Sequence, residues 1–304
     1  MKYLVIGAGG TGGVIAGYMA KAGKDVTLLA RGKHLEAIKA KGLKIIRPAD
    51  EFTVTIKAVS EEEYSDKADV IFVCVKGYSL NDIVPVIKKA AHNNTIVIPI
   101  LNIFSTGVTL QEQLPELLVT DGCIYVASMI KEAGCILMKG NILRVIFGVR
   151  NSSEYKDALK DVEKDLKESN IEGTLSNCIR KDALMKFSYV SPQGACGVFY
   201  NVPAGSIQKD GIYRDCFSEL VHEIDMLANA MDIHFDEDIV KRNLKILDEL
   251  DPSATTSMQR DIAEGKKSEV DGLIYEVIRL ATSYGIKLPE YAKIAKELKN
   301  RGIS

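Results

Sequence analysis

The sequence predicts an α/β domain with a mostly parallel, doubly wound sheet, followed by an all-helical domain. Two observations predict this fold class. Over residues 1–150, short runs rich in Val and Ile alternate with helical patterns, which is typical of right-handed crossovers and a parallel sheet. Beyond residue 177 the strand patterns stop and only helical patterns remain. The length of 304 residues suits two such domains.

The first domain is expected to contain buried strands with helices between them. Apolar runs predict strands at Lys2–Ile6, Asp25–Ala30, Asp69–Val75 and Thr95–Leu101. Apolar residues on one helical face predict helices at Thr11–Ala22, Lys33–Lys41 and Leu80–Ala91. Three further runs lack intervening helices and are expected to add an antiparallel edge to the sheet: Cys123–Ile130, Cys135–Lys139 and Leu143–Val149. A charged helix at Ser153–Ser169 and a strand at Ile171–Ser176 are expected to end the domain.

The second domain is expected to be all-helical. Helical patterns occupy Arg180–Val190, Arg214–Met231, Glu237–Leu250 and Ser268–Tyr284. Helix-breaking Pro203, Pro252 and Pro289 lie between them. We place the boundary near residue 176, so the expected domains are residues 1–176 and 177–304.

Composition narrows the class of protein. Apolar residues make up 46% and charged residues 26%, and the formal net charge is −2. This balance favours neither a nucleic acid nor an anionic membrane as partner. The N-terminal apolar run is too short for a signal peptide, and no run of 18 apolar residues occurs, so a cytoplasmic location is the default. The six cysteines are expected to be buried free thiols, and the four histidines show no metal-ligand spacing, so no metal site is expected.

A glycine-rich turn directly follows the first expected strand. Gly7-Ala8-Gly9-Gly10-Thr11-Gly12 fits the pattern G-x-G-x-x-G and opens a helix. Gly7 would permit the tight turn, Gly9 the approach of a pyrophosphate, and Gly12 close packing of helix on strand. The helix N-terminus would present its N–H groups to the phosphates. The motif therefore predicts a Rossmann-type, dinucleotide-binding domain, against the alternative of a glycine turn without ligand.

The end of the second expected strand indicates which dinucleotide is bound. An NAD site usually carries Asp or Glu there, but this chain has Arg31, with Lys33 and His34 nearby. A guanidinium is suited to a 2′-phosphate, which a carboxylate would repel. NADP(H) is therefore favoured over NAD(H). The alternative is that Arg31 is a solvated loop cation.

Two more polar residues follow expected strands. Lys76 comes after Asp69–Val75 and Asn102 after Thr95–Leu101. In a doubly wound fold, ligands bind at the carboxyl ends of the strands, so both residues are candidate cofactor contacts and Asn102 also a substrate contact.

At this point the chain resembles the ketopantoate reductase (2-dehydropantoate 2-reductase) family over nearly its whole length. The matching pieces are Gly7–Gly12, Leu29-Ala30-Arg31-Gly32, Lys76, Asn102, Lys186, Ser257-Met258-Gln259-Arg260-Asp261 and Glu269-Val270-Asp271. The most specific is the Ser-Met-x-x-Asp…Glu-x-Asp arrangement. The resemblance implies NADPH-dependent reduction of ketopantoate to pantoate, in pantothenate and coenzyme A synthesis.

The resemblance also implies a role for each matching residue. Lys186 matches the lysine that stabilises and protonates the carbonyl oxygen. Glu269 matches an acid that orients this lysine or binds a substrate hydroxyl, and Ser257 matches a contact to the substrate carboxylate. Lys76 and Asn102 match residues at the nicotinamide and substrate end. Alone, Lys186 and Glu269 would be interpreted as a surface lysine and part of a charged loop.

The match fails at several positions where the family usually carries asparagine: Val190, Gly194, Ala204 and Ile274. Ile103 replaces a glycine after Asn102. Losing such hydrogen bonds to a hydroxylated substrate could cost on the order of 10²–10³ in selectivity. Two alternatives therefore stay open: a reductase of a more apolar 2-oxo acid, and a non-catalytic NADP(H)-binding sensor. A homodimer is also kept open, because helical domains of related dehydrogenases often dimerise.

Overall fold

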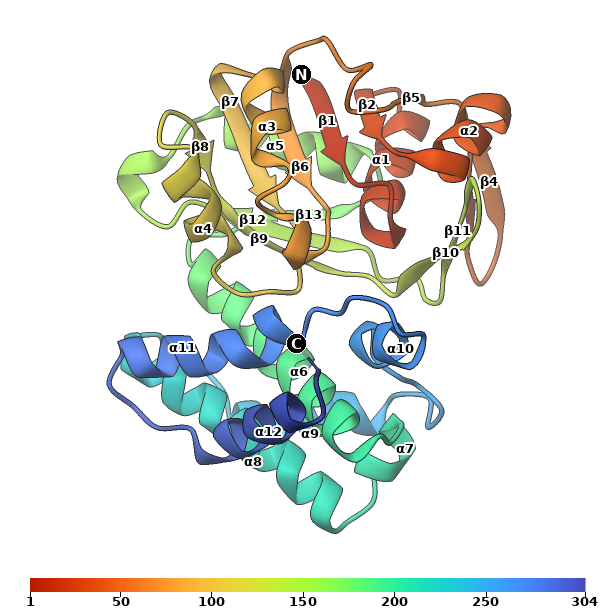
Figure 1. Ribbon diagram of the computed structural model, residues 1–304. Helices are drawn as coiled ribbons and strands as arrows, with labels where there is room; N and C mark the ends of the chain where they lie inside the picture. The colour runs from red at the N-terminus through yellow and green to blue at the C-terminus, as the bar shows by residue number, and fades with distance from the viewer. Residues whose placement is uncertain (304) are drawn as a thin grey trace. The chain divides into compact units, whose positions relative to one another are not determined.

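The computed structural model describes residues 1–303, which divide into two compact units (Figure 1). The first comprises Met1–Leu101 and Ser105–Ile179, and the second comprises Asn102–Phe104 and the residues from Arg180 onward. The expected boundary near residue 176 lies close to Ile179. The sequence did not indicate that Asn102–Phe104 belongs to the helical unit.

The first unit is built on a six-stranded sheet with strand order β5-β2-β1-β6-β7-β8, and every strand pair in it is parallel. Its strands are β1 (Lys2–Ile6), β2 (Asp25–Leu29), β5 (Lys57–Val59), β6 (Ala68–Val73), β7 (Ala91–Pro99) and β8 (Leu118–Val119). The helices of this unit are α1 (Gly10–Lys21), α2 (Gly32–Lys41), α3 (Val84–Ala90), α4 (Thr106–Gln113) and α5 (Ala158–Glu168), with 3₁₀ turns η1 (Gly77–Ser79) and η2 (Ser152–Glu154). The expected doubly wound α/β class is confirmed.

Alternation along the strands places a core on each face of this sheet. On β1, Tyr3 and Val5 join a core that includes residues of α1, α2 and α5. Leu4 and Ile6 point to the other face and join a core with residues of α3 and α4. Successive side chains of a strand point to opposite faces, so an uninterrupted apolar run is what a sheet covered on both faces requires.

The expected antiparallel edge of this sheet is wrong. The three runs that suggested it form strands of two separate sheets, with orders β10-β11-β3-β4 and β13-β12-β9. These strands are β3 (Leu43–Ile46), β4 (Glu51–Val54), β9 (Asp121–Tyr125), β10 (Ser128–Glu132), β11 (Cys135–Met138), β12 (Arg144–Gly148) and β13 (Glu172–Leu175). Strands β3 and β4 form an antiparallel hairpin that the sequence did not predict, and β11 pairs in parallel with β3. Because β3 and β4 were not expected, the central parallel sheet was the only expected sheet to which these three runs could be assigned.

The second unit is helical, as expected. Its elements are α6 (Ile179–Tyr200), α7 (Ala204–Ile207), α8 (Ile212–Ala230), α9 (Ile239–Asp248), α10 (Ser257–Ala263), a π-helical turn η3 (Asp271–Tyr275), α11 (Glu276–Ser283) and α12 (Pro289–Asn300). Pro289 opens α12 instead of separating helices. Its first turn is held by the buried carboxylate of Glu223, which accepts the backbone N–H groups of Glu290 and Tyr291 at 2.7 and 2.9 Å.

Helix α6 continues ten residues past the expected end at Val190, although it contains Pro192. Proline lacks the N–H that would bond to the carbonyl four residues earlier, here that of Ser188. The fully buried side chain of Asn243 donates to this carbonyl instead, at 2.9 Å. A distant residue therefore satisfies the carbonyl group that the proline releases.

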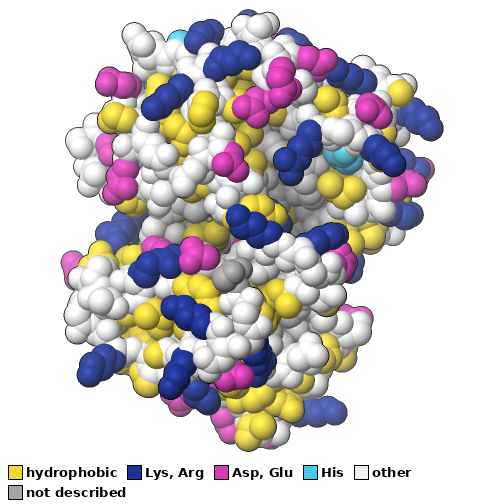
Figure 2. Space-filling model, viewed as in Figure 1, with side chains coloured by type: hydrophobic (Ala, Val, Ile, Leu, Met, Phe, Trp, Pro, Cys, Tyr) yellow, Lys and Arg dark blue, Asp and Glu magenta, His cyan; other side chains and the backbone are white. Residues whose placement is uncertain are grey.

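Residues 1–303 bear on three expectations from composition: membrane spans, the state of the cysteines and the surface charge. No helix in this range is long and apolar enough to span a membrane. All six cysteines are free, but only four are buried, because Cys178 is exposed and Cys74 is half-buried. On the face shown in Figure 2, acidic and basic side chains are interspersed.

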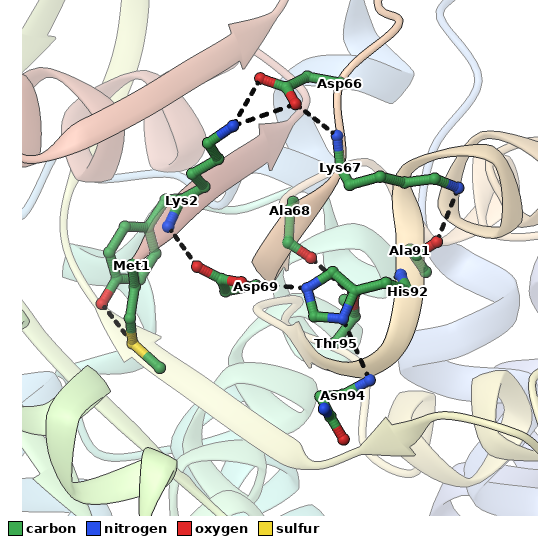
Figure 3. A network of polar contacts seen from close by, with 11 residues as sticks. Met1, Lys2, Asp66, Lys67, Ala68, Asp69, Ala91, His92, Asn94 and Thr95 are labelled. Carbon is green, nitrogen blue, oxygen red and sulfur yellow. Dashed lines mark hydrogen bonds and ion pairs between the residues drawn. The ribbon is translucent and has the colours of Figure 1, made fainter.

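At the amino ends of the central strands, Asp69 joins β6 to β1 and β7 (Figure 3). Its carboxylate accepts the backbone N–H of Lys2 at 2.7 Å and lies 3.0 Å from Nε2 of His92. These contacts hold the pKa of Asp69 below its ordinary value. The His92 N–H donates to the Thr95 hydroxyl at 2.8 Å, and this hydroxyl donates to the Ala68 carbonyl at 2.6 Å.

We predict that Asp69→Ala lowers the free energy of unfolding by about 1 kcal/mol, because two hydrogen-bonding contacts lose their acceptor. The carboxylate is 42% exposed, so solvent limits the loss. Urea denaturation measures it. Asp66→Ala is the matched control, since Asp66 contacts the exposed ammonium of Lys2 and the backbone N–H of Lys67 in its own loop. An equal loss in both variants would contradict the cross-strand role of Asp69.

Candidate active site

The glycine turn between β1 and α1 has the close packing that the sequence predicted. Gly7 has φ +102°, a conformation that side chains disfavour. A methyl group at Gly12 would stand 2.0 Å from the Gly7 carbonyl oxygen and 2.8 Å from Cβ of Cys74. The tight turn expected at Gly7 and the close packing expected at Gly12 are therefore confirmed. Gly10 is equally constrained, because a methyl group there would stand 2.7 Å from the Ser128 carbonyl oxygen.

Gly9 differs from the other glycines of the turn. It is the N-cap of α1, provides no side-chain cap, and has open space where a side chain would stand. Ala8 lies beside it, and Thr11 lies in the first turn of α1. Uncapped N–H groups beside open space fit a phosphate group. The contact of this turn with a pyrophosphate stays a prediction.

A cavity of about 640 Å³ lies beside this turn within the first unit. Gly7, Ala8 and Gly9 line it together with Arg31 at the end of β2 and Lys76 after β6. A cavity of this volume lies in the range of ligand sites. Three of the predicted cofactor elements thus meet at the carboxyl edge of one sheet, where doubly wound folds bind ligands. The residues present fit a dinucleotide.

Arg31 and His34 lie at the start of α2 and line the same cavity. Arg31 is exposed and can reach an anion. His34 is not suited to supply a second positive charge, because burial lowers its pKa and its Nδ1 accepts the backbone N–H of Gly134 at 3.0 Å. The cationic contribution at this end of the cavity therefore falls to Arg31.

Two carboxylates in the cavity lining escaped the sequence analysis. Glu61 and Glu62 follow β5, which pairs with β2, so they line the same cavity as Arg31. A hydrogen bond from Ser60 lowers the pKa of Glu62, which keeps it ionised. The sequence could not place these two carboxylates beside Arg31, because neither β5 nor its pairing with β2 was predicted.

In the helical unit, the structure brings Lys186 and Asn102 together. Lys186 lies on α6 with only 8% of its surface exposed, and its Nζ donates to Oδ1 of Asn102 at 2.6 Å. Burying an ammonium is costly unless it is hydrogen-bonded, so this contact holds the charge in place. Judged alone, Lys186 would have been interpreted as a surface lysine, and this interpretation is wrong.

The other predicted residues of the helical unit occupy separate elements. Ser257 is the half-buried first residue of α10. Glu269 is buried and lies two residues before the π-helical turn η3. The charged-loop interpretation of Glu269 is wrong, since only 6% of the residue is exposed. The contacts of both residues with a substrate stay predictions.

The altered asparagine positions fall into two groups. Ala204 and Ile274 are buried in the core of the helical unit, where apolar side chains pack. Val190 and Gly194 instead follow Lys186 at intervals of four residues and therefore share one face of α6 with it. A methyl group at Gly194 would stand 2.7 Å from Cε of Met258, on α10. The face that continues from Lys186 is therefore apolar.

Comparison with known proteins identifies the family. The model for ketopantoate reductase PanE/ApbA matches residues 3–152, and the model for its C-terminal part matches residues 178–301. The chain belongs to the ketopantoate reductase family. Membership supports an oxidoreductase that acts on a CH–OH/C=O group with a nicotinamide cofactor.

Relatives of this family member are distant in sequence but match over nearly the full length. The uncharacterized oxidoreductase YkpB of Bacillus subtilis is 26% identical over 289 residues, covering 95% of both chains. The 2-dehydropantoate 2-reductase of Pyrococcus horikoshii is 25% identical over 297 residues, covering 95% of this chain and 93% of its own.

Solved structures show the same fold. A ketopantoate reductase from Ralstonia eutropha has a TM-score of 0.88 at 23% identity, covering 98% of this chain and 97% of its own. A D-mandelate dehydrogenase, solved with NADH and anilino(oxo)acetate, has a TM-score of 0.86 at 19% identity, covering 97% and 96%.

The lowered pKa of His34 predicts a pH-dependent stability. The unfolded chain takes up this proton near the ordinary pKa of 6.5, whereas the folded chain does so only at lower pH. The contribution of His34 to the free energy of unfolding is therefore fully present above about pH 6.5. It is lost as the pH falls through the pKa of His34 in the folded chain. His34→Asn keeps an acceptor for Gly134 and should lose less thermal stability between about pH 7 and 5. The Tm of both proteins is measured as a function of pH. The same fall in Tm for wild type and His34→Asn would refute this account of His34.

Proposed function

We propose that this protein reduces ketopantoate to pantoate with NADPH, a reaction of pantothenate and coenzyme A synthesis, at the Lys186 site. The observation that carries the proposal is the buried ammonium of Lys186, held 2.6 Å from Oδ1 of Asn102. The Pyrococcus relative that bears the name of this activity matches the chain over both units. We expect the protein to act in the cytoplasm, and a homodimer as its assembly.

Each candidate site residue has a separate proposed role in this reaction. A bound reduced nicotinamide supplies hydride to the carbonyl carbon. Negative charge then develops on the carbonyl oxygen, where the Lys186 ammonium stabilises it and donates a proton from Nζ. Asn102 accepts from the same ammonium and so orients it towards the substrate. Ser257 is proposed to bind the substrate carboxylate, and Glu269 to orient Lys186 or bind the substrate hydroxyl.

A second candidate is the reduction of a more apolar 2-oxo acid. It is favoured by the face of α6 that carries Val190 and Gly194, with Met258 packed over Gly194. Asparagine at those positions would offer hydrogen bonds to a hydroxyl group, whereas this face offers methyl and methylene groups. The D-mandelate dehydrogenase of the same fold, whose structure holds anilino(oxo)acetate, indicates that the fold accommodates such acids.

Two substrates that differ by one hydroxyl group separate these candidates. Steady-state oxidation of NADPH is measured with ketopantoate and with 3,3-dimethyl-2-oxobutanoate, which lacks only the hydroxyl. A higher kcat/KM for ketopantoate supports the first candidate, and the reverse preference supports the second. NADPH binding without turnover of any 2-oxo acid would support the sensor alternative and overturn the proposed reaction.

We predict that Lys186→Ala lowers kcat by ~10²-fold or more, because it removes the proposed proton donor. Binding of NADPH should change little, because the glycine turn, Arg31 and Lys76 lie in the other unit. Lys181→Ala is the matched control: Lys181 lies on the same helix and pairs with the exposed Asp236. An unchanged kcat in Lys186→Ala would remove this residue from the mechanism.

We predict that Arg31→Ala weakens NADPH binding much more than NADH binding, because only NADPH carries the 2′-phosphate that the guanidinium would bind. Replacing Glu61 and Glu62 together by Gln should act in the opposite sense. Removing two carboxylates from this cavity should raise the NADPH to NADH affinity ratio by about 2- to 5-fold. Glu63→Gln is the control, since Glu63 pairs with Lys39. Fluorescence titration measures each affinity, and equal weakening of both cofactors by Arg31→Ala would refute its role.

A further inference from the structure

Three consecutive residues, Asn102–Phe104, belong to the helical unit although Leu101 and Ser105 belong to the first unit. We name them the 102–104 segment. Each of its side chains has a partner in the helical unit. Asn102 accepts from Lys186, and the ring of Phe104 lies 6.1 Å from that of Phe187.

Ile103 has its own contact, with Gly272 on the π-helical turn η3. A methyl group at Gly272 would stand 2.3 Å from Cδ1, 2.7 Å from Cγ1 and 3.0 Å from Cγ2 of Ile103. These three atoms are the nearest neighbours of that position. The isoleucine side chain therefore occupies the space that a side chain at residue 272 would take. Neither residue can gain or lose volume without affecting the other.

The turn that carries Gly272 is itself held in place. The guanidinium of Arg279 binds both carboxylate oxygens of Asp271, each at 2.9 Å. Leu273 packs into the core of the helical unit. π-Helical turns interrupt regular helices and often occur at functional sites. Ile103 thus contacts a turn that buried Leu273 anchors in the core, with the Asp271–Arg279 pair at its surface.

The 102–104 segment needs such an anchor because the chain leaves it under strain. Ser105, the next residue, has φ +68°, a left-handed conformation that costs a residue other than glycine about 1–2 kcal/mol. Without side-chain contacts the segment would be free to relax away from this conformation. Its displacement would carry the Asn102 carboxamide away from the Lys186 ammonium.

We propose that Ile103 is a positioning residue: packed against Gly272, it holds Asn102 on Lys186 and thereby sets the position of the proton donor. This inference rests on the proposed function for its catalytic consequence, but the contact itself can be tested without turnover. A displacement of about 1 Å at a reacting group can lower the rate by about 10²-fold, so the anchor affects kcat more than KM.

Four variants test the proposal. Ile103→Ala removes the anchor, and Gly272→Ala places a methyl group where Ile103 lies. The double variant joins both changes, so that the new methyl group occupies the vacated space. Ile103→Val keeps a branched side chain and serves as the conservative rescue. Ile233→Ala, a buried large-to-small change elsewhere in the same unit, is the control for general loosening.

The first readout is independent of activity. Reductive methylation of the protein without cofactor, followed by mass spectrometry, gives the labelling rate of the Lys186 amine. We expect Ile103→Ala and Gly272→Ala to raise this rate several-fold, because Asn102 no longer holds the amine. The rate should stay near wild type in Ile103→Val and Ile233→Ala, and the double variant should exceed wild type less than Gly272→Ala does.

The second readout is the split between kcat and KM with a 2-oxo acid that the wild type reduces. Ile103→Ala and Gly272→Ala should each lose about 10- to 100-fold in kcat with a much smaller change in KM. The double variant should be less impaired than the sum of the single losses, because the two residues share one space. Additive losses, unchanged Lys186 labelling, or equal effects in Ile233→Ala would each overturn the proposal. If the wild type reduces no 2-oxo acid, the proposed function fails, and labelling alone decides the role of Ile103.

Discussion

The buried ammonium of Lys186 is the constraint on which the candidate catalytic site depends. Lys186 has only 8% of its surface exposed, so its charge requires a hydrogen-bond partner, and Asn102 provides one at 2.6 Å. Asn102 follows β7 in the chain but belongs to the helical unit. The acceptor for the proposed proton donor is therefore a residue that the chain supplies shortly after a strand of the first unit.

Much of the fold could be predicted from local pattern, because the central strands are buried on both faces. The run Tyr3–Ile6 has no polar face, and only a sheet covered by helices on both sides accommodates such a run. Pairing could not be predicted in the same way. Whether β12 joins the large sheet or β9 depends on partners distant in sequence, which periodicity does not report. The continuation of α6 through Pro192 likewise depended on Asn243, 51 residues further on.

The cofactor residues of the first unit and the Lys186 site of the helical unit differed in how far they could be predicted from the sequence. The glycine turn was predictable because its pattern lies within one strand and the start of one helix, although its glycines also pack against the distant residues Cys74 and Ser128. Glu61 and Glu62 could not be placed, since they meet Arg31 only through the pairing of β5 with β2. Lys186 became a candidate only by resemblance, because no property of its own helix distinguishes it from a surface lysine. Its burial is a property of the whole helical unit.

Two glycine positions of the helical unit are packed in the same way. At Gly194 and at Gly272, a position without a side chain is filled by a long apolar residue from another element, Met258 and Ile103 respectively. The space beside each glycine is thereby filled, as the close packing of protein interiors requires. Of these four residues, only Gly194 and Ile103 depart from the family pattern. The packing at Gly194 therefore bears on how the substrate fits, whereas the packing at Gly272 bears on the position of Asn102.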